Sequence, residues 1–184
     1  MTVGNLHQHP YKGLDVLLLS WTHVVKKFPD ARLIVVGGDS TRDKRFTLLF
    51  KNQLNQLNIV NSVEFAGYVN HIDQMLERAS VFVLPSRIEG LSNALLEAMA
   101  FGLPCIATSI SGSRDLIQDG VNGILVPPEN VDLLSDKIIQ LFDAPELADT
   151  IGKEARRTVA GHYQMETVAN FYVNSYQELL VNQR

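Results

Sequence analysis

The stretch that decides the fold runs from Val81 to Ala100 and reads Val-Phe-Val-Leu-Pro-Ser-Arg-Ile-Glu-Gly-Leu-Ser-Asn-Ala-Leu-Leu-Glu-Ala-Met-Ala. Its first four residues are all apolar, which is typical of a short strand buried on both faces. Ser92 is a good N-cap and predicts a helix from there to about Ala100. Glu89 then lies in the loop at the carboxyl end of the strand, and Glu97 lies about 7.5 Å along the helix.

The two glutamates lie on either side of the start of the predicted helix. The free backbone N–H groups and the positive dipole end of a helix N-terminus suit a phosphate. An ionised carboxylate only accepts hydrogen bonds, so it suits a pair of hydroxyl donors. Two carboxylates with an anion site between them therefore indicate a nucleotide sugar. Spacing alone favours the plainer interpretation, in which both glutamates are solvated surface acids.

Working outward, short apolar runs alternate with helical patterns along most of the chain. The strand-like runs cover 31–36, 62–66, 81–84, 104–107 and 123–126, and the helical patterns cover 14–28, 42–57, 71–79, 92–101 and 130–142. Repeated βα units predict an α/β fold, a Rossmann-like doubly wound parallel sheet with helices on both faces. Ligands of such sheets bind beyond the carboxyl ends of the strands, where the strand order reverses.

Length and composition fit one domain over residues 1–184, ending in a helical tail over 145–184. The chain is 46% hydrophobic, which is enough for a substantial core. Its net charge of −4 shows no basic excess, so neither nucleic acid nor an anionic membrane is expected as a partner. The single cysteine, Cys105, excludes an internal disulfide and fits a reducing compartment. No apolar run reaches the roughly 20 residues of a membrane span, and no signal peptide is visible, so we expect a cytoplasmic protein.

The tail differs from the rest because two helical patterns follow each other between residues 145 and 181 with no strand between them. The second pattern places apolar side chains on one stripe, formed by Val168, Phe171, Tyr172, Tyr176, Leu179 and Leu180. This stripe either packs on the sheet or faces a partner.

The segment from Pro85 to Thr108 resembles the Glu-x7-Glu motif of retaining glycosyltransferases of the GT-B fold, and most resembles glycosyltransferase family 4. Four more segments follow the order of that family: Val3-Gly4, Lys12-Gly13, 65–69 (Phe-Ala-Gly-Tyr-Val) and 120–128 (Gly-Val-Asn-Gly-Ile-Leu-Val-Pro-Pro). The resemblance implies the C-terminal, donor-binding half of the fold. It also implies that the N-terminal domain, which binds the sugar or glycoconjugate acceptor, lies outside these 184 residues.

The same resemblance gives the motif residues their roles. It assigns Glu97 to the ribose hydroxyls of a nucleoside diphosphate sugar donor and Glu89 to the hydroxyls of the donor sugar. The backbone of Gly90, Leu91 and Ser92 would meet the sugar and the phosphate. Because Gly90 has no side chain, a ligand can approach the main chain there.

Lys12 resembles the family lysine that neutralises the diphosphate, so Lys12 and Glu89 are the predicted catalytic residues. The arginine of the family's Val-Gly-Arg-Leu segment is replaced by Asn5, which can donate a hydrogen bond but carries no charge. Arg87 and Arg114 are candidates to supply the missing positive charge.

Tyr68 and Val69 fall where the family holds the base of the nucleotide. We expect neither a metal nor another cofactor, because no Asp-x-Asp segment is present and the one close histidine pair, His7 and His9, has no carboxylate beside it. The leading hypothesis is the donor-binding half of a retaining, metal-independent glycosyltransferase of the hexosyltransferase type. Two alternatives stay open: a nucleotide-sugar binding module without transfer activity, and a sugar epimerase on the same fold.

Overall fold

The computed structural model of the chain describes residues 1–163. Six short strands form the middle layer: β1 (Thr2–Val3), β2 (Leu33–Val36), β3 (Val63–Gly67), β4 (Phe82–Leu84), β5 (Cys105–Thr108) and β6 (Ile124–Val126). The helices around them are α1 (Leu14–Lys27), α2 (Arg45–Gln56), α3 (Ile72–Glu77), α4 (Asn93–Phe101), α5 (Ser111–Arg114), α6 (Val131–Asp143) and α7 (Pro145–His162), with 3-10 turns η1 (Leu6–Gln8) and η2 (Val60–Ser62). The predicted stripe over 168–180 lies outside the described residues.

The strands form two parallel halves, ordered β1-β2-β3 and β4-β5-β6. Two hydrogen bonds join the halves, because Val83 N–H donates to the Met1 carbonyl at 2.8 Å and the Met1 amino group donates to the Val81 carbonyl at 2.7 Å. The sheet therefore runs β3-β2-β1-β4-β5-β6, which is the order of a doubly wound sheet. Its order reverses between β1 and β4. The predicted α/β class and parallel sheet are confirmed.

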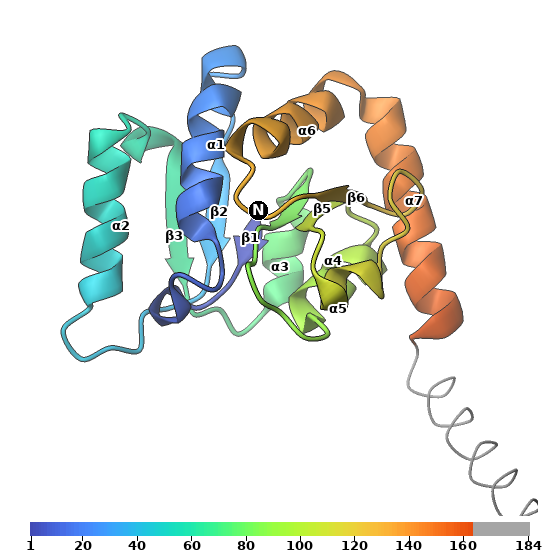
Figure 1. The fold of residues 1–184 in the computed structure, drawn as a ribbon, viewed down its shortest axis with the longest axis horizontal. Coiled ribbons are helices and arrows are strands. Elements are labelled where there is room, and N and C mark those ends of the chain that lie inside the picture. The colour runs from blue at the N-terminus through green and yellow to red at the C-terminus, as the bar shows by residue number, and fades with distance from the viewer. Residues whose placement is uncertain (164–184) are drawn as a thin grey trace, which may run out of the picture.

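Both faces of the sheet are covered, because alternate side chains of each strand point in opposite directions. Leu33 and Val35 belong to the apolar cluster that includes α1 and α6, whereas Ile34 and Val36 belong to the cluster that includes α4. Figure 1 shows α1 and α6 packed side by side on one flank and α4 next to α7 on the other. The buried Cys105 is part of the second cluster, and burial raises the pKa of its thiol.

Helix α4 forms as the sequence predicts. The Ser92 hydroxyl accepts a hydrogen bond from the Leu95 N–H at 3.4 Å, which caps the first turn. The helix ends at Phe101, and its C-cap, Gly102, has a φ of 87° in the left-handed region that favours glycine. This cap places the N-terminus of α4 directly after the loop that carries Glu89.

Helix α2 starts three residues later than the pattern predicts, at Arg45 instead of 42, and the carboxylate of Asp39 explains the difference. Asp39 is 4% exposed and accepts hydrogen bonds from the backbone N–H groups of Thr41 and Thr47, both at 2.9 Å, and from their hydroxyls. Burial opposes ionisation of Asp39, but these hydrogen bonds outweigh it, so the pKa of the carboxyl lies below its ordinary value. The carboxylate thus holds residues 39–44 as a loop.

We expect Asp39→Asn to lower the urea midpoint of unfolding at pH 7, because the amide cannot accept these bonds with a full negative charge. A depressed pKa contributes stability above the ordinary value of 3.8, and that stability is lost as the pH falls through the lowered value. The difference in urea midpoint between wild type and Asp39→Asn should therefore narrow below about pH 4. Asp136→Asn, an exposed change on α6, is the control. A difference in urea midpoint that stays constant from pH 7 to pH 3 would contradict a stabilising role for the ionised Asp39 carboxylate.

Candidate functional site

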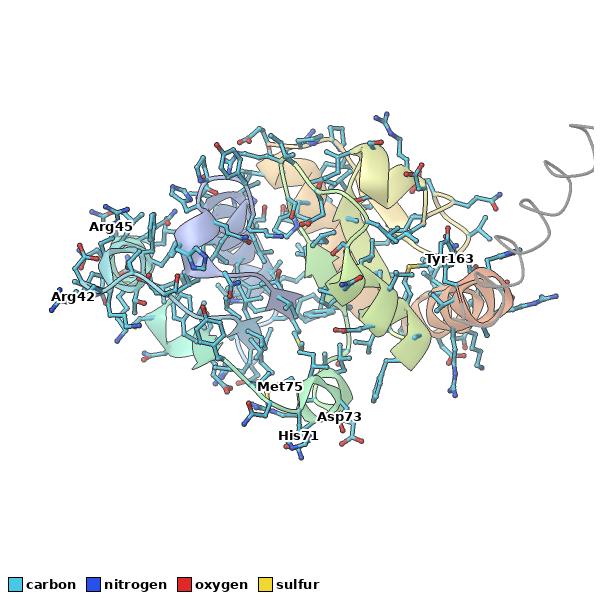
Figure 2. All side chains as sticks on the ribbon, turned by 90° about the horizontal axis from the view of Figure 1, so that it is seen from below. Arg42, Arg45, His71, Asp73, Met75 and Tyr163 are labelled. Atoms are coloured by element: carbon cyan, nitrogen blue, oxygen red, sulfur yellow. The ribbon has the colours of Figure 1, made fainter. Side chains whose placement is uncertain are left out.

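The candidate site lies at the carboxyl ends of the strands, where the loops after β1 and β4 meet. These loops are neighbours because the strand order reverses between β1 and β4. Figure 2 views the molecule from this edge, with α2 and its Arg45 at one end and α7 with Tyr163 at the other. Figure 1 shows the loops before α1 and α4 together at the same end of the sheet.

The structure brings the two predicted catalytic residues into direct contact. Lys12 Nζ lies 2.6 Å from Glu89 Oε2, although the residues are 77 positions apart in the sequence. Their side chains are 24% and 16% exposed, so the pair is largely shielded from solvent. The Ser86 hydroxyl also donates to Glu89 Oε2, at 3.2 Å. A cation and a carboxylate are thus held together in the loop pair that precedes α1 and α4.

The loop between Glu89 and α4 presents its main chain to the open edge. A Cβ built on Gly90 meets nothing within 4 Å, and Leu91 is 55% exposed. The backbone N–H groups of Asn93 and Ala94, in the first turn of α4, find no acceptor among residues 1–163. Free N–H groups beside a lysine are suited to an anionic ligand.

Glu97 lies one turn further along α4 than Asn93 and is exposed. Within the described part of the chain it makes no ion pair. Glu89 and Glu97 therefore differ: the first is paired and half-buried, and the second is free to accept hydrogen bonds from a ligand.

Close packing of glycines holds the loop of Glu89 from two sides. Gly13 has a φ of 63°, and a Cβ there would lie 1.9 Å from the Pro85 carbonyl oxygen. A Cβ on Gly112, in α5, would lie 1.8 Å from the carbonyl oxygen of Gly90. The sequence indicates Gly13 through its motif but gives no role to Gly112, whose partner comes from a distant loop.

The residues predicted to hold the base lie further along the sheet. Tyr68 follows β3 and is 64% exposed, and a Cβ on Gly38 would lie 2.1 Å from its ring. Val69 is half-buried and packs on the apolar cluster that contains α4. Asn5 is half-buried and lines a small pocket of about 20 Å³ together with Lys12. Asn5 and Lys12 thus share one loop, whereas Tyr68 and Val69 follow a strand two positions away from β1 in the sheet.

The guanidinium of Arg87, predicted to bind substrate, is instead occupied by protein groups. It donates to both carboxylate oxygens of Asp15, at 2.8 and 2.7 Å, and also to Glu129 and to the Pro10 carbonyl. Hydrogen bonding to Asp15 raises the pKa of Arg87. Burial opposes ionisation of Asp15, but its hydrogen bond and charge interaction with Arg87 hold the pKa of that carboxyl below its usual range. Arg87 is therefore not a free cation in this arrangement, and Arg114 is exposed on α5.

Between residues 1 and 163 there is no group of three or more His, Cys, Asp or Glu side chains that could hold a metal ion. No helix in this part of the chain is long and apolar enough to cross a membrane.

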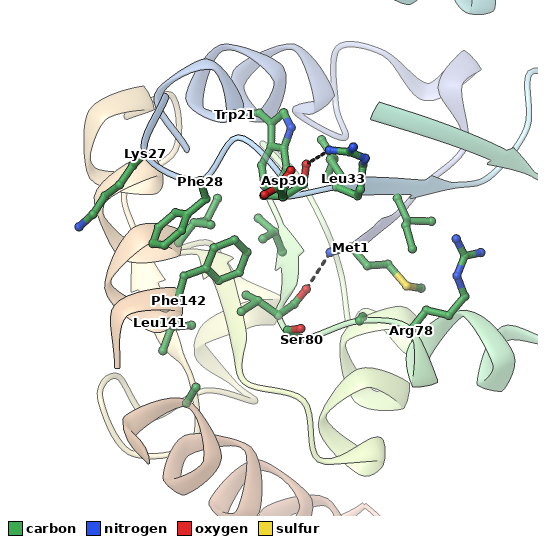
Figure 3. Close-up of a pocket in the computed structure, with 18 of the residues that line it drawn as sticks. Met1, Trp21, Lys27, Phe28, Asp30, Leu33, Arg78, Ser80, Leu141 and Phe142 are labelled. Carbon is green, nitrogen blue, oxygen red and sulfur yellow. Dashed lines mark hydrogen bonds between the residues drawn. The ribbon is translucent and has the colours of Figure 1, made fainter. Parts of the chain in front are cut away.

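A cavity of about 730 Å³ lies at the opposite edge of the sheet, at the amino ends of the strands (Figure 3). Trp21, Phe28 and Phe142 are among the residues that line it. Two of the cations at its rim already have partners, since Lys27 pairs with Asp143 and Arg78 with Glu64. We place the candidate site at the other edge because that edge holds the paired Lys12 and Glu89 and the helix N-terminus.

The family model described as glycosyl transferases group 1 matches residues 1–144. The chain belongs to this family. A relative from Haemophilus influenzae, an uncharacterized glycosyltransferase, is 36% identical over 148 residues, which cover 80% of this chain and 40% of that protein. The chain thus spans well under two thirds of the length of this relative.

Solved glycosyltransferase structures share the fold. TarM of Staphylococcus aureus, as a mutant in complex with fondaparinux, alpha-GlcNAc-glycerol and UDP, is 28% identical with a TM-score of 0.83, covering 94% of this chain and 34% of TarM. The C-terminal domain of a glycosyl transferase group 1 family protein (LpcC) from Francisella tularensis is 25% identical with a TM-score of 0.79, covering 90% of this chain and 84% of that domain. This glycosyl transferases group 1 chain therefore has the fold of the C-terminal GT-B domain.

Proposed function

We propose that the chain is the donor-binding half of a retaining, metal-independent glycosyltransferase and that it binds a nucleoside diphosphate sugar. The observation that carries the proposal is the contact between Lys12 and Glu89 beside the free N-terminus of α4. The two loops together then offer a cation and free N–H groups to a diphosphate. They also offer carboxylates to the hydroxyl groups of the ligand. Membership of the glycosyl transferases group 1 family supports the same class of reaction.

In this proposal the diphosphate lies between Lys12 and the first turn of α4. Lys12 Nζ now pairs with Glu89 and would share its hydrogen bonds with a phosphate oxygen when the donor binds. The N–H groups of Asn93 and Ala94 would add uncharged donors, which offsets in part the lack of charge at Asn5. The UDP in the TarM structure is consistent with a uridine nucleotide, and we use UDP as the probe below.

The chemistry required of these residues is the stabilisation of a leaving group. Departure of the nucleoside diphosphate adds negative charge to the phosphate that leaves, and a fixed cation and fixed N–H groups stabilise that charge. Glu89 would hold the sugar hydroxyls while its own negative charge faces the electron-poor ring. Glu97 would hold the ribose. No step of this scheme requires a metal ion.

Two features bear on the rest of the proposal. The chain spans 40% of its Haemophilus relative, so we propose that the acceptor site of the full enzyme lies outside these 184 residues. The one cysteine is buried and suits a reducing compartment, so we propose that the protein works in the cytoplasm.

The proposal predicts different losses for the two glutamates. Glu97→Ala should weaken UDP and a UDP-sugar alike, by about 1.5 to 3 kcal/mol, because it removes a charged acceptor from the ribose. Glu89→Ala should weaken the UDP-sugar by a similar amount and leave UDP no weaker, because Glu89 faces the sugar. Isothermal titration calorimetry of both variants with both ligands measures the difference.

The control for these titrations is Glu77→Ala, which removes an exposed glutamate from α3. It should bind both ligands as wild type does. Equal losses of UDP affinity in Glu97→Ala and Glu89→Ala would refute the division of roles. A wild-type chain that binds neither UDP nor a UDP-sugar, while folding normally, would reject UDP-sugars as donors.

A further inference from the structure

We propose that Arg87 is a positioning residue that locks the loop of Lys12 onto the loop of Glu89, and that it does not itself bind the diphosphate. We call this link between the two loops the clamp. The inference rests on the proposed function for the identity of the ligand, but the clamp itself is present in the protein without a ligand. It assigns to the arginine of the Glu-x7-Glu segment a task that its place in the sequence does not indicate.

Arg87 joins the two loops through both its side chain and its main chain. Its guanidinium donates to the Pro10 carbonyl, and its backbone N–H donates to the Tyr11 carbonyl at 2.7 Å. These acceptors come directly before Lys12 in the chain, and Arg87 itself comes two residues before Glu89. Two links between the loops therefore lie next to the 2.6 Å contact between Lys12 and Glu89.

Two carboxylates from other elements fix the plane of the guanidinium. Asp15, in the first turn of α1, accepts from Nη1 and Nη2 at 2.8 and 2.7 Å. Glu129, in the loop before α6, accepts from Nη2 at 3.0 Å and also from Nε. Such a fork-shaped arrangement requires arginine, because a lysine ammonium cannot donate in one plane to two carboxylates.

The backbone of Glu129 supports a dedicated role for this contact. Glu129 has a φ of 63°, in the left-handed region, which is unfavourable for a residue with a side chain. A glycine would adopt this conformation freely, but it would remove the carboxylate from Arg87. A strained backbone at the residue that holds the clamp is therefore an observation separate from the hydrogen bonds.

The local charge argues against direct binding of phosphate by Arg87. One guanidinium faces two carboxylates, Asp15 and Glu129, whose negative charges repel a phosphate. The Arg87 side chain is also only 22% exposed. A diphosphate would have to displace both carboxylates to reach it. Lys12, whose one carboxylate partner among residues 1–163 is Glu89, is the cation that a ligand can share.

Titration with UDP distinguishes a positioning role of Arg87 from direct binding of the diphosphate, because the two predict opposite changes in UDP affinity. If Arg87 positions the loops, Arg87→Met should lower the affinity for UDP about tenfold, and Asp15→Asn and Glu129→Gln should lower it too. If Arg87 binds the diphosphate directly, removing its carboxylate partners frees the guanidinium and UDP binds more tightly. Tighter binding by Asp15→Asn or Glu129→Gln would overturn the proposal.

Two further variants sharpen the result. Arg87→Lys keeps the charge but loses the fork, so it should bind UDP as weakly as Arg87→Met; wild-type affinity would overturn the clamp. The double variant Arg87→Met/Lys12→Ala should lose little affinity beyond Lys12→Ala alone, because a displaced loop matters only through the lysine that it carries. Additive losses would mean that Arg87 contributes independently of Lys12 and would also overturn the clamp.

Amide hydrogen exchange without nucleotide keeps the clamp testable if the proposed function fails. The Gly13 N–H donates to the Pro10 carbonyl at 3.1 Å, in the loop that Arg87 holds. In Arg87→Lys and Glu129→Gln this amide should exchange faster, while the amides of β5 keep their wild-type rates. If the wild-type chain does not bind UDP, the proposed ligand is rejected but the clamp is not. Unchanged exchange at Gly13 would reject the clamp itself.

Discussion

Replacing Gly13 by alanine is expected to destabilise the protein by about 2 to 5 kcal/mol. The new Cβ would lie 1.9 Å from the Pro85 carbonyl oxygen, which is far inside contact distance, and the φ of 63° is unfavourable for alanine. Relief of this overlap must move the loop of Lys12 away from the loop of Glu89. We therefore expect a lower urea midpoint and, at temperatures where the variant is folded, weaker binding of UDP.

Two other glycines separate the causes of this loss. Gly120 has a φ of 75° with open space around its Cβ position, so Gly120→Ala should show the backbone strain alone, about 1 to 2 kcal/mol. Gly161, near the end of α7, has open space and an ordinary φ, so Gly161→Ala should be neutral or slightly stabilising. If Gly13→Ala lowers the free energy of unfolding no more than Gly120→Ala does, the close packing of the two loops contributes nothing to the requirement for glycine at position 13.

The parts of the fold that follow from local patterns can be predicted from the sequence. The strands β2 to β6 and the helices α1, α4 and α6 fall within a few residues of their predicted positions. Each strand has a short apolar run, interrupted in β3 by Glu64, and each helix has an apolar stripe. Strand β1 has two residues, and α5 has four, so neither is long enough to show a period. Helix α2 starts later than its pattern predicts because a side chain, Asp39, holds the preceding loop.

The candidate site is predictable where it depends on topology and not where it depends on distant side chains. Lys12 and Glu89 both follow strands that flank the reversal of the strand order, so a doubly wound sheet brings their loops together. The partners of Arg87 come from the loop after β1, from α1 and from the loop before α6. No sequence pattern connects these three segments, so the contacts that Arg87 makes within the protein could not be predicted from the motif in which it lies.

The 184 residues assayed alone are expected to bind a UDP-sugar but to transfer its sugar at a rate close to that of the uncatalysed reaction. All the residues to which we assign a role lie along one edge of the sheet, and Gly90, Leu91 and Glu97 are exposed there. A donor bound at this edge meets water instead of an aligned acceptor. Holding two reactants in line contributes up to about 7 to 11 kcal/mol to catalysis, so its loss dominates every single substitution above.

The measurement is the transfer of radiolabel from UDP-sugars to a mixture of sugar acceptors, with free sugar from hydrolysis counted separately. The chain is assayed alone and after mixing with a candidate N-terminal half supplied as a separate protein. The mixture should transfer, and Glu89→Ala in the mixture should abolish the gain, which ties the activity to this site. Because an open donor site can still activate the leaving group, slow hydrolysis by the chain alone is compatible with the proposal. Robust transfer to an acceptor by the chain alone is not, since it would require an acceptor site within the 184 residues.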